Sequence, residues 1–211
     1  MLATYIVIGI IAYAIGSISF SVIFSKKFAG FDVREKGSGN AGTTNVLRTV
    51  GKKVAALTLI CDTLKGTAAV LIAMLIGNIF EIPNKAILIQ IAAIFVLIGH
   101  TFPVYFGFKG GKGVATSLGI VLLVNWQIGA ICLVFALLLM AFTRMVSVGS
   151  CSVAVLYPVL TLFIHENYLV EEGSAYFIYS IIMGAIVLFN HRSNIKRILN
   201  GNENKLSLGK K

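Results

Sequence analysis

The segment of residues 37–48, GSGNAGTTNVLR, gathers glycines, small polar side chains and one arginine in an otherwise apolar chain. Glycine permits positive φ angles and close backbone approach, so consecutive backbone N–H groups here can converge on an anion. Arg48 follows Thr44 and Asn45 at helical distance and can add a bidentate contact to phosphate or carboxylate. The alternative interpretation of this loop, taken alone, is an ordinary Gly/Asn turn whose arginine only sets membrane orientation.

A second glycine-rich segment, residues 99–119, reads GHTFPVYFGFKGGKGVATSLG. It places the run 109–113 directly before a predicted helix that begins near Val114. The N-terminus of a helix offers unpaired N–H groups and a positive dipole end, both of which suit phosphate. The run lacks the Ser/Thr after lysine and the glycine spacing of a P-loop, and no acidic partner for magnesium is visible. We therefore predict a phosphate-binding turn without nucleotide, metal or other cofactor; a flexible basic hairpin is the alternative.

Two further polar segments follow. Residues 143–147, TRMVS, form a predicted turn between two helices with one arginine and two hydroxyls on the same side. In FNHRSNIKRILNG, residues 189–201, three polar side chains are spaced so that they share one helical face: Asn190, His191 and Asn194. The apolar residues that follow predict a short interfacial helix. His191 alone is typical of a capping residue, but beside two asparagines it is a candidate ligand for substrate oxygens.

The composition places these segments in a membrane protein. Of 211 residues, 57% are hydrophobic and 12% charged, and the mean hydropathy is +0.91, which leaves too little polar surface for a water-soluble globule of this size. The apolar residues fall in stretches of roughly 17–25, the length that a helix needs to cross about 30 Å of hydrocarbon. The predicted fold class is an all-α polytopic integral membrane protein, with a single domain over residues 1–211.

Seven transmembrane helices are predicted, the first an uncleaved helix with its N-terminus outside. A split at residues 125–127 makes two short spans; without it, the basic tail 192–211 would lie outside and the acidic segment 165–172 inside. With the split, every Lys and Arg except Lys65 and Lys85 lies at the cytoplasmic side, together with the C-terminus. The predicted spans are 2–24, 54–77, 86–107, 114–125, 127–142, 146–164 and 174–190.

Charged and thiol groups occur inside the predicted spans. Asp62 and Lys65 lie three residues apart at a depth where charges are costly and are usually functional. A mutual ion pair that fixes helix packing is one interpretation, and contact with a substrate or a proton is the other. Cys61, Cys132 and Cys151 are odd in number and lie in apolar spans, which predicts free thiols rather than disulfides or a zinc site.

Together, the polar segments resemble the signatures of one bacterial enzyme family. The patterns GSGNxGxTNxxR, DxxKG, GHxFPVxFxFKGGKGVATxxG, TRxxS and NHRxNIxRxLxG occur in this order between about residue 16 and residue 201. They closely resemble those of the acyl-phosphate:glycerol-3-phosphate acyltransferase family. Many members have proline where Ala41 stands, a departure that removes some turn rigidity and no chemical group.

The resemblance implies transfer of a fatty acyl group from acyl phosphate to the 1-hydroxyl of glycerol 3-phosphate. The products would be lysophosphatidic acid and phosphate, in the first step of phospholipid synthesis. The catalytic residues expected from this resemblance are Ser38, Arg48, Lys112, His191 and Asn194. With their neighbours in the four segments, the expected substrate-binding residues are Gly39, Asn40, Thr44, Asn45, Lys109, Gly110, Gly111, Gly113, Arg144, Ser147 and Asn190.

The resemblance also implies a location and partners. It implies a multi-pass protein of the bacterial plasma membrane, with the active site at the cytoplasmic face. The expected partners are acyl phosphate, glycerol 3-phosphate, membrane lipid and a cytosolic enzyme that produces acyl phosphate. Nucleic acid is not an expected partner.

The leaving group suggests a mechanism. An acyl phosphate is a mixed anhydride, so alignment of the hydroxyl and stabilisation of the oxyanion can suffice. Another large class of acyltransferases uses a His-x₄-Asp motif, but Tyr105, Val170 and Lys196 stand where that aspartate would follow each histidine. Our hypothesis is direct attack without an acyl-enzyme, in which the phosphate of the substrate accepts the proton and Ser38 donates a hydrogen bond.

Two other classes of function stay open at this point. A transporter for phosphate or an organophosphate would suit the intramembrane Asp62 and Lys65, although the anion-binding segments share one face and the unequal spans show no paired halves. A lipid-binding scaffold would explain the net charge of +10 but would leave the glycine loops unexplained.

Overall fold

The computed structural model describes residues 2–164 and 173–206. In these residues all regular structure is helical, which confirms the predicted all-α class. The chain divides into two compact units, residues 1–123 and residues 124–211, and each is described by itself. The single domain stays a prediction.

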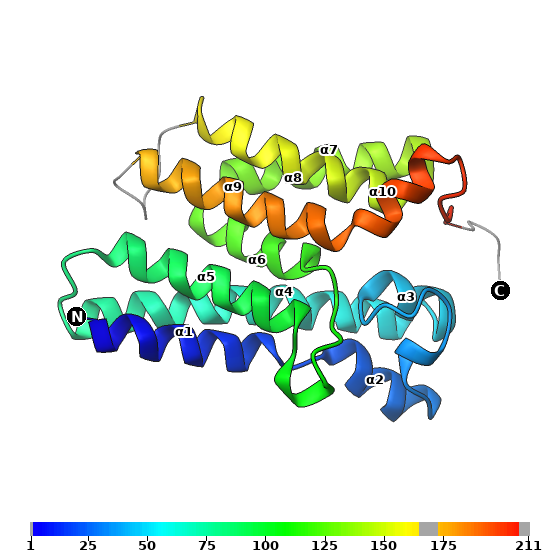
Figure 1. Ribbon diagram of the computed structural model, residues 1–211, viewed down its shortest axis with the longest axis horizontal. Coiled ribbons are helices and arrows are strands. Elements are labelled where there is room, and N and C mark those ends of the chain that lie inside the picture. The colour runs from blue at the N-terminus through cyan, green and yellow to red at the C-terminus, as the bar shows by residue number, and fades with distance from the viewer. Residues whose placement is uncertain (1, 165–172, 207–211) are drawn as a thin grey trace. The chain divides into compact units, whose positions relative to one another are not determined.

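Three long helices lie side by side in the first unit (Figure 1): α1 (Leu2–Gly16), α4 (Lys52–Ile79) and α5 (Lys85–Thr101). Glycines let the backbones of α1 and α5 approach closely. A Cβ on Gly16 would collide with the Val96 carbonyl, and a Cβ on Gly99 would collide with the Tyr13 carbonyl. Such small residues permit tight helix packing in membranes, where the hydrophobic effect does not drive helices together.

The sixth helix, α6 (Val114–Val124), approaches α4 in the same way. A Cβ on Gly66 of α4 would collide with the Thr116 carbonyl, and one on Gly119 of α6 with the Thr63 carbonyl. The start of α6, where the second glycine loop ends, is therefore held firmly against a long helix.

The predicted first span is broken. A single helix was expected over residues 2–24, but the structure has two helices there. Helix α1 ends at Gly16, and α2 (Phe20–Ala29) begins after a short break. In the break, the Ile18 carbonyl accepts a hydrogen bond from Lys65 Nζ at 2.8 Å. This bond satisfies a backbone group that the end of a helix leaves without a partner.

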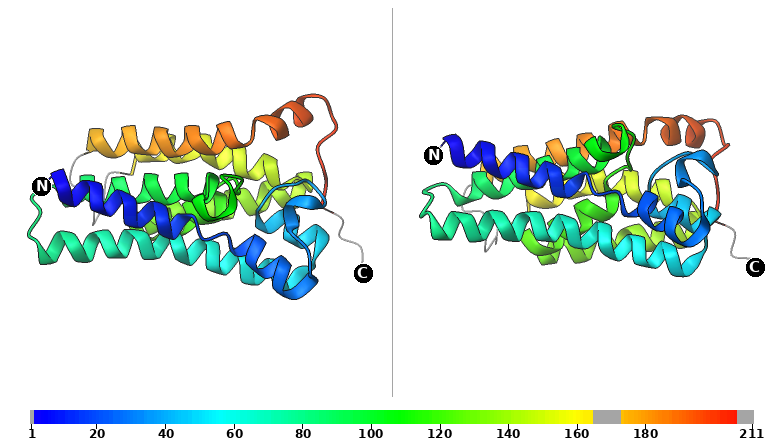
Figure 2. Two further views of the ribbon diagram at one scale, coloured as in Figure 1. Left: turned by 60° about the horizontal axis from the view of Figure 1, so that its bottom comes forward. Right: turned by 90° about the horizontal axis from the view of Figure 1, so that it is seen from below.

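The segment between α2 and α4 carries two further helical elements that the hydropathy pattern did not predict. These are η1 (Val33–Glu35) and α3 (Thr43–Thr49). Buried Val22, Val33, Val46 and Ala55 form an apolar cluster beneath them. Figure 2 shows α2 and α3 together at one end of the unit. The first glycine loop is thus a folded platform rather than an open loop.

Four helices make up the second unit: α7 (Trp126–Thr143), α8 (Val146–Thr161), α9 (Gly173–Asn190) and α10 (Arg192–Leu199). In this unit α8 packs against both α7 and α9. The axis of α10 bends by 64° from that of α9. The predicted short helix after the last span is therefore confirmed.

The predicted split near residue 125 is confirmed. Helix α6 ends at Val124 and α7 begins at Trp126. The Asn125 side chain caps α7 by accepting a hydrogen bond from Ile128 N at 3.0 Å. The split was inferred from charge distribution alone, and the cap supplies its local cause.

Four segments among the described residues are long and apolar enough to cross a membrane, and five if α9 and α10 are counted as one bent span. Helices α6 and α8 are apolar but shorter. The count of seven spans and the outside N-terminus therefore stay predictions. The acidic segment 165–172, on which the orientation argument partly depends, lies outside the described residues.

Candidate active site

The first glycine loop is organised by Asn45, whose side chain is buried in it. Asn45 Oδ1 accepts a hydrogen bond from Ser38 N at 2.9 Å. Its Nδ2 donates to Val33 O at 2.8 Å and to Lys36 O at 3.0 Å. Gly37 lies against the same amide, where a Cβ would collide with Oδ1. Asn45 thus holds the loop in shape, and any contact that it makes with substrate stays a prediction.

The loop presents its predicted catalytic residues outward. Ser38 is exposed between two glycines in the left-handed region, Gly37 at φ +63° and Gly39 at φ +70°. Arg48 is exposed in the last turn of α3. The predicted binding residues Asn40 and Thr44 are half-buried nearby in the chain. The positive φ angles confirm that glycine is needed here for its backbone conformation.

The second glycine loop packs back on the end of α5. Gly110 N donates to Thr101 O and Gly111 N donates to His100 O, each at 3.0 Å. A Cβ on Gly110 would collide with the His100 carbonyl, and one on Gly111 with the His100 imidazole. These two amides are therefore already used within the protein, and the binding roles predicted for Gly110 and Gly111 stay predictions.

Backbone donors for an anion are instead found at the start of α6. The first helical hydrogen bond there runs from Ser117 N to Gly113 O at 2.8 Å, so the N–H groups of residues 114–116 precede it. Gly113 has a φ of +88°, and a Cβ on it would collide with Leu97. Lys112 is half-buried directly before this helix end, and Lys109 is exposed. The arrangement suits a phosphate at the helix N-terminus.

The structure brings the two glycine loops together. Arg34, which follows α2, donates from Nη1 to Phe106 O at 2.6 Å and to Lys109 O at 3.2 Å. The Ala41 carbonyl of the first loop lies beside Gly111 of the second, in the space that a Cβ would need. The two glycine loops of the first unit are therefore in direct contact, and a shared anion-binding surface of their predicted residues stays a prediction.

In the second unit, His191 and Asn194 are buried at the junction of α9 and α10. His191 Nδ1 lies 2.8 Å from Val187 O. A carbonyl only accepts hydrogen bonds, so Nδ1 carries a hydrogen and Nε2 is the acceptor nitrogen of the neutral ring. Asn194 Nδ2 donates to Glu203 Oε1 at 2.8 Å. Both side chains are thus held in defined orientations.

Glu203 ties the C-terminal segment to α10. Its Oε2 accepts from Arg197 Nε at 2.9 Å, beside the bond from Asn194. Burial opposes ionisation of Glu203, but the hydrogen bonds, that from Asn194 foremost, outweigh it and lower the pKa of this carboxyl below its usual value. Glu203 is therefore an ionised group that fixes the amide of Asn194.

The predicted turn between α7 and α8 belongs to the same region of the second unit. Arg144 is exposed, has a φ of +60° and accepts at its carbonyl a hydrogen bond from Leu206 N at 2.7 Å. Ser147 is buried in the first turn of α8, and Asn190 is half-buried at the end of α9. The convergence of this set with Arg48 and Lys112 in one pocket stays a prediction.

Comparison with known proteins decides the family. The sequence model named "Glycerol-3-phosphate acyltransferase" matches residues 6–201. The chain is 43% identical over 203 residues to the glycerol-3-phosphate acyltransferase of Clostridioides difficile strain 630, with 96% of each protein covered. The chain belongs to the glycerol-3-phosphate acyltransferase family.

Solved structures agree with this acyltransferase assignment. The chain is similar to the crystal structure of PlsY (YgiH), an integral membrane glycerol 3-phosphate acyltransferase, in its glycerol 3-phosphate form. The TM-score is 0.83 at 33% identity, with 96% of each chain covered. The lysophosphatidic acid form gives a TM-score of 0.81 at 32% identity, covering 96% of this chain and 95% of that one. The acyltransferase is thus an all-helical integral membrane enzyme, as the sequence predicted.

Sequence reasoning missed that His100 joins Asp62 and Lys65 in a buried polar cluster beneath the second loop of this acyltransferase. Asp62 Oδ1 lies 2.9 Å from Lys65 Nζ and 3.7 Å from His100 Nδ1. All three side chains are buried. The ion pair predicted for Asp62 and Lys65 is present, and its role in helix packing rather than in contact with a substrate or a proton stays a prediction. In the sequence, His100 stands out only by its position directly before the Pro-containing turn. That position does not predict a buried contact with Asp62.

Sequence reasoning also missed Asp32, Arg34 and Glu203 of the acyltransferase. Arg34 reads as one more cytoplasmic basic residue, and only its contacts with the second loop set it apart. A weak signal existed for Glu203, which is the single acidic residue in the basic stretch after residue 172.

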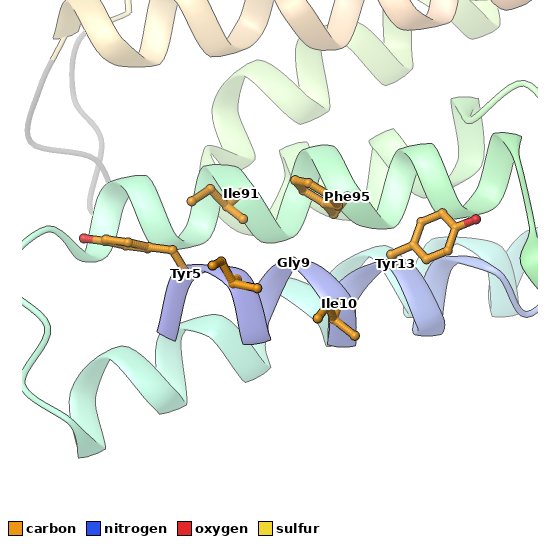
Figure 3. Close-up of a pocket in the computed structure, with 7 residues that line it drawn as sticks. Tyr5, Gly9, Ile10, Tyr13, Ile91 and Phe95 are labelled. Carbon is orange, nitrogen blue, oxygen red and sulfur yellow. The ribbon is translucent and has the colours of Figure 1, made fainter. Parts of the chain in front are cut away.

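A separate apolar groove runs between α1 and α5 of the acyltransferase (Figure 3). Its volume is about 380 Å³, and it contains none of the predicted site residues. The lining residues are Tyr5, Ile6, Gly9, Ile10, Tyr13, Ile91 and Phe95.

Proposed function

We propose that this acyltransferase moves a fatty acyl group from an acyl phosphate to the 1-hydroxyl of glycerol 3-phosphate. The products are lysophosphatidic acid and inorganic phosphate, in the first step of phospholipid synthesis. The observation that carries the proposal is the full-length similarity to a protein solved in a glycerol 3-phosphate form and in a lysophosphatidic acid form. The second glycine loop supports it, because the N–H groups at the start of α6, where this loop ends, can donate to an anion.

The two substrates each carry a phosphate, and a phosphate monoester has a charge of about −1.5 to −2 at neutral pH. Arg48, Lys109, Lys112 and the amides at the start of α6 supply positive charge and donors for them. Arg144 adds a cation from the second unit. His191 and Asn194 bind oxygens of glycerol 3-phosphate, with Glu203 holding the amide of Asn194 in place.

The reaction is direct attack. The 1-hydroxyl oxygen of glycerol 3-phosphate attacks the acyl carbon, the new ester bond forms, and the bond from that carbon to the phosphate oxygen breaks. The hydroxyl proton passes to a substrate phosphate. Ser38 donates a hydrogen bond to the oxyanion and forms no covalent bond, since a mixed anhydride already has a good leaving group.

The acyltransferase acts in the bacterial plasma membrane with its site at the cytoplasmic face. The acyl tail enters sideways from the inner leaflet, and a cytosolic enzyme supplies the acyl phosphate. The basic character of the glycine loops and of the C-terminal segment supports this orientation.

Purified protein in detergent tests the reaction. Incubation with acyl phosphate and glycerol 3-phosphate should yield lysophosphatidic acid and phosphate in equal amounts. An enzyme forms these products without two compartments, whereas a transporter does not form them. Radiolabelled acyl phosphate without acceptor should leave no label on the protein. A labelled ester at Ser38 would refute direct attack, and the absence of product would refute the proposed function.

The Lys112→Ala variant tests the phosphate-binding turn. We expect the KM for glycerol 3-phosphate to rise by about tenfold or more, with a smaller fall in kcat, because a charge-assisted contact made in both ground and transition states is lost. Lys205→Ala, in the C-terminal segment, is the control for loss of one positive charge. An unchanged KM in Lys112→Ala would remove Lys112 from this role.

A further inference from the structure

An ion pair between Asp32 and Arg34 lies between the two glycine loops. Asp32 Oδ1 accepts hydrogen bonds from Arg34 N and Arg34 Nε, both at 3.0 Å. Asp32 Oδ2 accepts from Arg34 Nη2 at 2.8 Å. The remaining terminal nitrogen of the guanidinium, Nη1, reaches Phe106 O and Lys109 O in the second loop. The planar guanidinium is thus shared between a carboxylate and two carbonyls, an arrangement that lysine cannot reproduce.

The first end of this connection is fixed. Asp32 caps η1 and is buried, and the neighbouring Val33 is fully buried in the apolar cluster beneath the first loop. Hydrogen bonding by Arg34 lowers the pKa of Asp32 to about 2, so the carboxylate is charged at any pH used for assay. The guanidinium is therefore anchored to the platform of the first loop.

The second end of the connection is a turn that needs support. Gly107 has a φ of +66° and Phe108 a φ of +59°, and a bulky residue in the left-handed region is unfavourable. Phe108 is 57% exposed, so its own burial does not hold the turn. The two carbonyls that Arg34 binds, those of Phe106 and Lys109, lie on either side of this pair. Arg34 is thus placed to keep the turn in its unfavourable conformation.

We propose that the Asp32–Arg34 pair is a positioning device that sets the second glycine loop, with Lys109 and Lys112, against the first. Arg34 acts through the loop backbone and does not bind the substrate phosphate, because its charge is directed to Asp32. The proposal rests on the proposed function for its kinetic consequence. It extends the acyltransferase site by two residues that touch no reacting atom.

The test compares Arg34→Lys, Arg34→Ala and Asp32→Asn in the purified protein. If Arg34 positions the loop, lysine should fail nearly as badly as alanine, with the KM for glycerol 3-phosphate raised about tenfold and kcat changed less. Asp32→Asn should raise KM in the same direction by a smaller factor. If Arg34→Lys keeps a normal KM while Arg34→Ala does not, the residue supplies charge to the substrate and the proposal is wrong.

A second measurement needs no substrate. Limited trypsin digestion at Lys109 should become several-fold faster in Arg34→Lys than in the parent protein, at an unchanged melting temperature in detergent, because only the turn is released. Lys26→Ala is the matched control, since Lys26 Nζ lies 3.5 Å from Asp32 Oδ2 but its side chain is 59% exposed. Equal cleavage of all variants at Lys109 would refute the positioning role of the Asp32–Arg34 pair. Absence of acyl transfer in the parent protein would instead refute the proposed function. The digestion experiment would still test the positioning role of Arg34, because it needs no substrate.

Discussion

In the first glycine loop, Gly37 and Gly39 have φ angles of +63° and +70°, whereas Gly110 and Gly111 of the second loop lie outside the left-handed region and press against His100. Gly39 is glycine because of backbone conformation alone, and Gly37 combines that requirement with a lack of space for a Cβ beside Asn45 Oδ1. The second pair is glycine because no space exists for a Cβ. Similar-looking runs of glycine thus answer two different physical demands.

The supports beneath the two loops differ in the same way. The first loop is held by Asn45, a neutral amide with three hydrogen bonds to the loop backbone. The second loop rests on the end of α5, where His100 lies over the buried ion pair of Asp62 and Lys65. A neutral support can lose one bond at a time, whereas removal of one charge from a buried pair leaves the other without compensation.

The largest effect is expected for Asp62→Ala, which leaves the ammonium of Lys65 buried without its carboxylate. We expect a loss of about 3–5 kcal/mol in unfolding free energy, measured as thermal unfolding in detergent. The double variant Asp62→Leu/Lys65→Met should recover much of this loss, since it removes both charges. An equal loss in the single and double variants would contradict a role for the buried ion pair.

Asn45→Ala should have the next largest effect, because it leaves three backbone groups of the first loop without their partner. The expected loss is about 2–4 kcal/mol, with a strong fall in activity as Ser38 loses its fixed position. Thr43→Ala, in the same helix, is the matched control and keeps these bonds. If the Asn45 variant keeps the parent melting temperature but binds glycerol 3-phosphate poorly, Asn45 is a substrate ligand rather than the loop support.

Gly111→Ala and Gly39→Ala separate the two demands on glycine directly. A Cβ at residue 111 meets the His100 imidazole and the Ala41 carbonyl, so about 1–3 kcal/mol of stability should be lost together with a raised KM for glycerol 3-phosphate. At residue 39 the nearest atom is Arg34 O at 3.5 Å, so only the left-handed backbone cost of about 1–2 kcal/mol applies. Substitution by Asn, which tolerates that conformation, should recover stability at 39 and not at 111.

The smallest expected effect is a pH dependence shared by both loops through Asp32. Its pKa falls from the usual 3.8 to about 2 because of hydrogen bonding by Arg34. The local stability that Asp32 gives to the turn of the second loop is therefore complete above about pH 3.8 and is lost as the pH falls toward 2. Trypsin is inactive there, so pepsin cleavage of the loop can follow this loss. Asp32→Asn should abolish the increase in pepsin cleavage that the protonation of Asp32 causes. The same pH dependence of cleavage in the variant and the parent would contradict this role of Asp32.

Much of the fold followed from local composition. The long helix α4, for example, lies at Lys52–Ile79 where the span 54–77 was predicted, because apolar length alone defines such a helix. The break at Asn125 followed from the distribution of charged residues. The break near Ile18 did not, because Ser17 and Ser19 are too few to end an apolar span and its stabilising partner, Lys65, is distant in the sequence.

The candidate site was predictable in its residue types and less so in its contacts. The glycine, lysine and arginine residues of the two loops indicated anion binding, and family comparison agrees with an enzyme that handles glycerol 3-phosphate. Gly110 and Gly111 were expected to offer their amides to phosphate, but those amides donate to the end of α5. No local pattern reveals such a bond, since its acceptors belong to the helix that the loop folds back upon.

The amino-acid sequence by itself determined that this is a membrane protein, that it is helical and where its polar segments lie. Each of these properties depends on the composition of neighbouring residues. Only the tertiary structure decided which polar side chains are held by contacts within the protein. Asn45 was a predicted binding residue, and Arg34 and His100 carried no distinctive signal in the sequence, yet each contacts backbone or a buried charge. A hydrogen-bonding group binds whichever partner the fold brings within reach, and that partner is often far away in sequence.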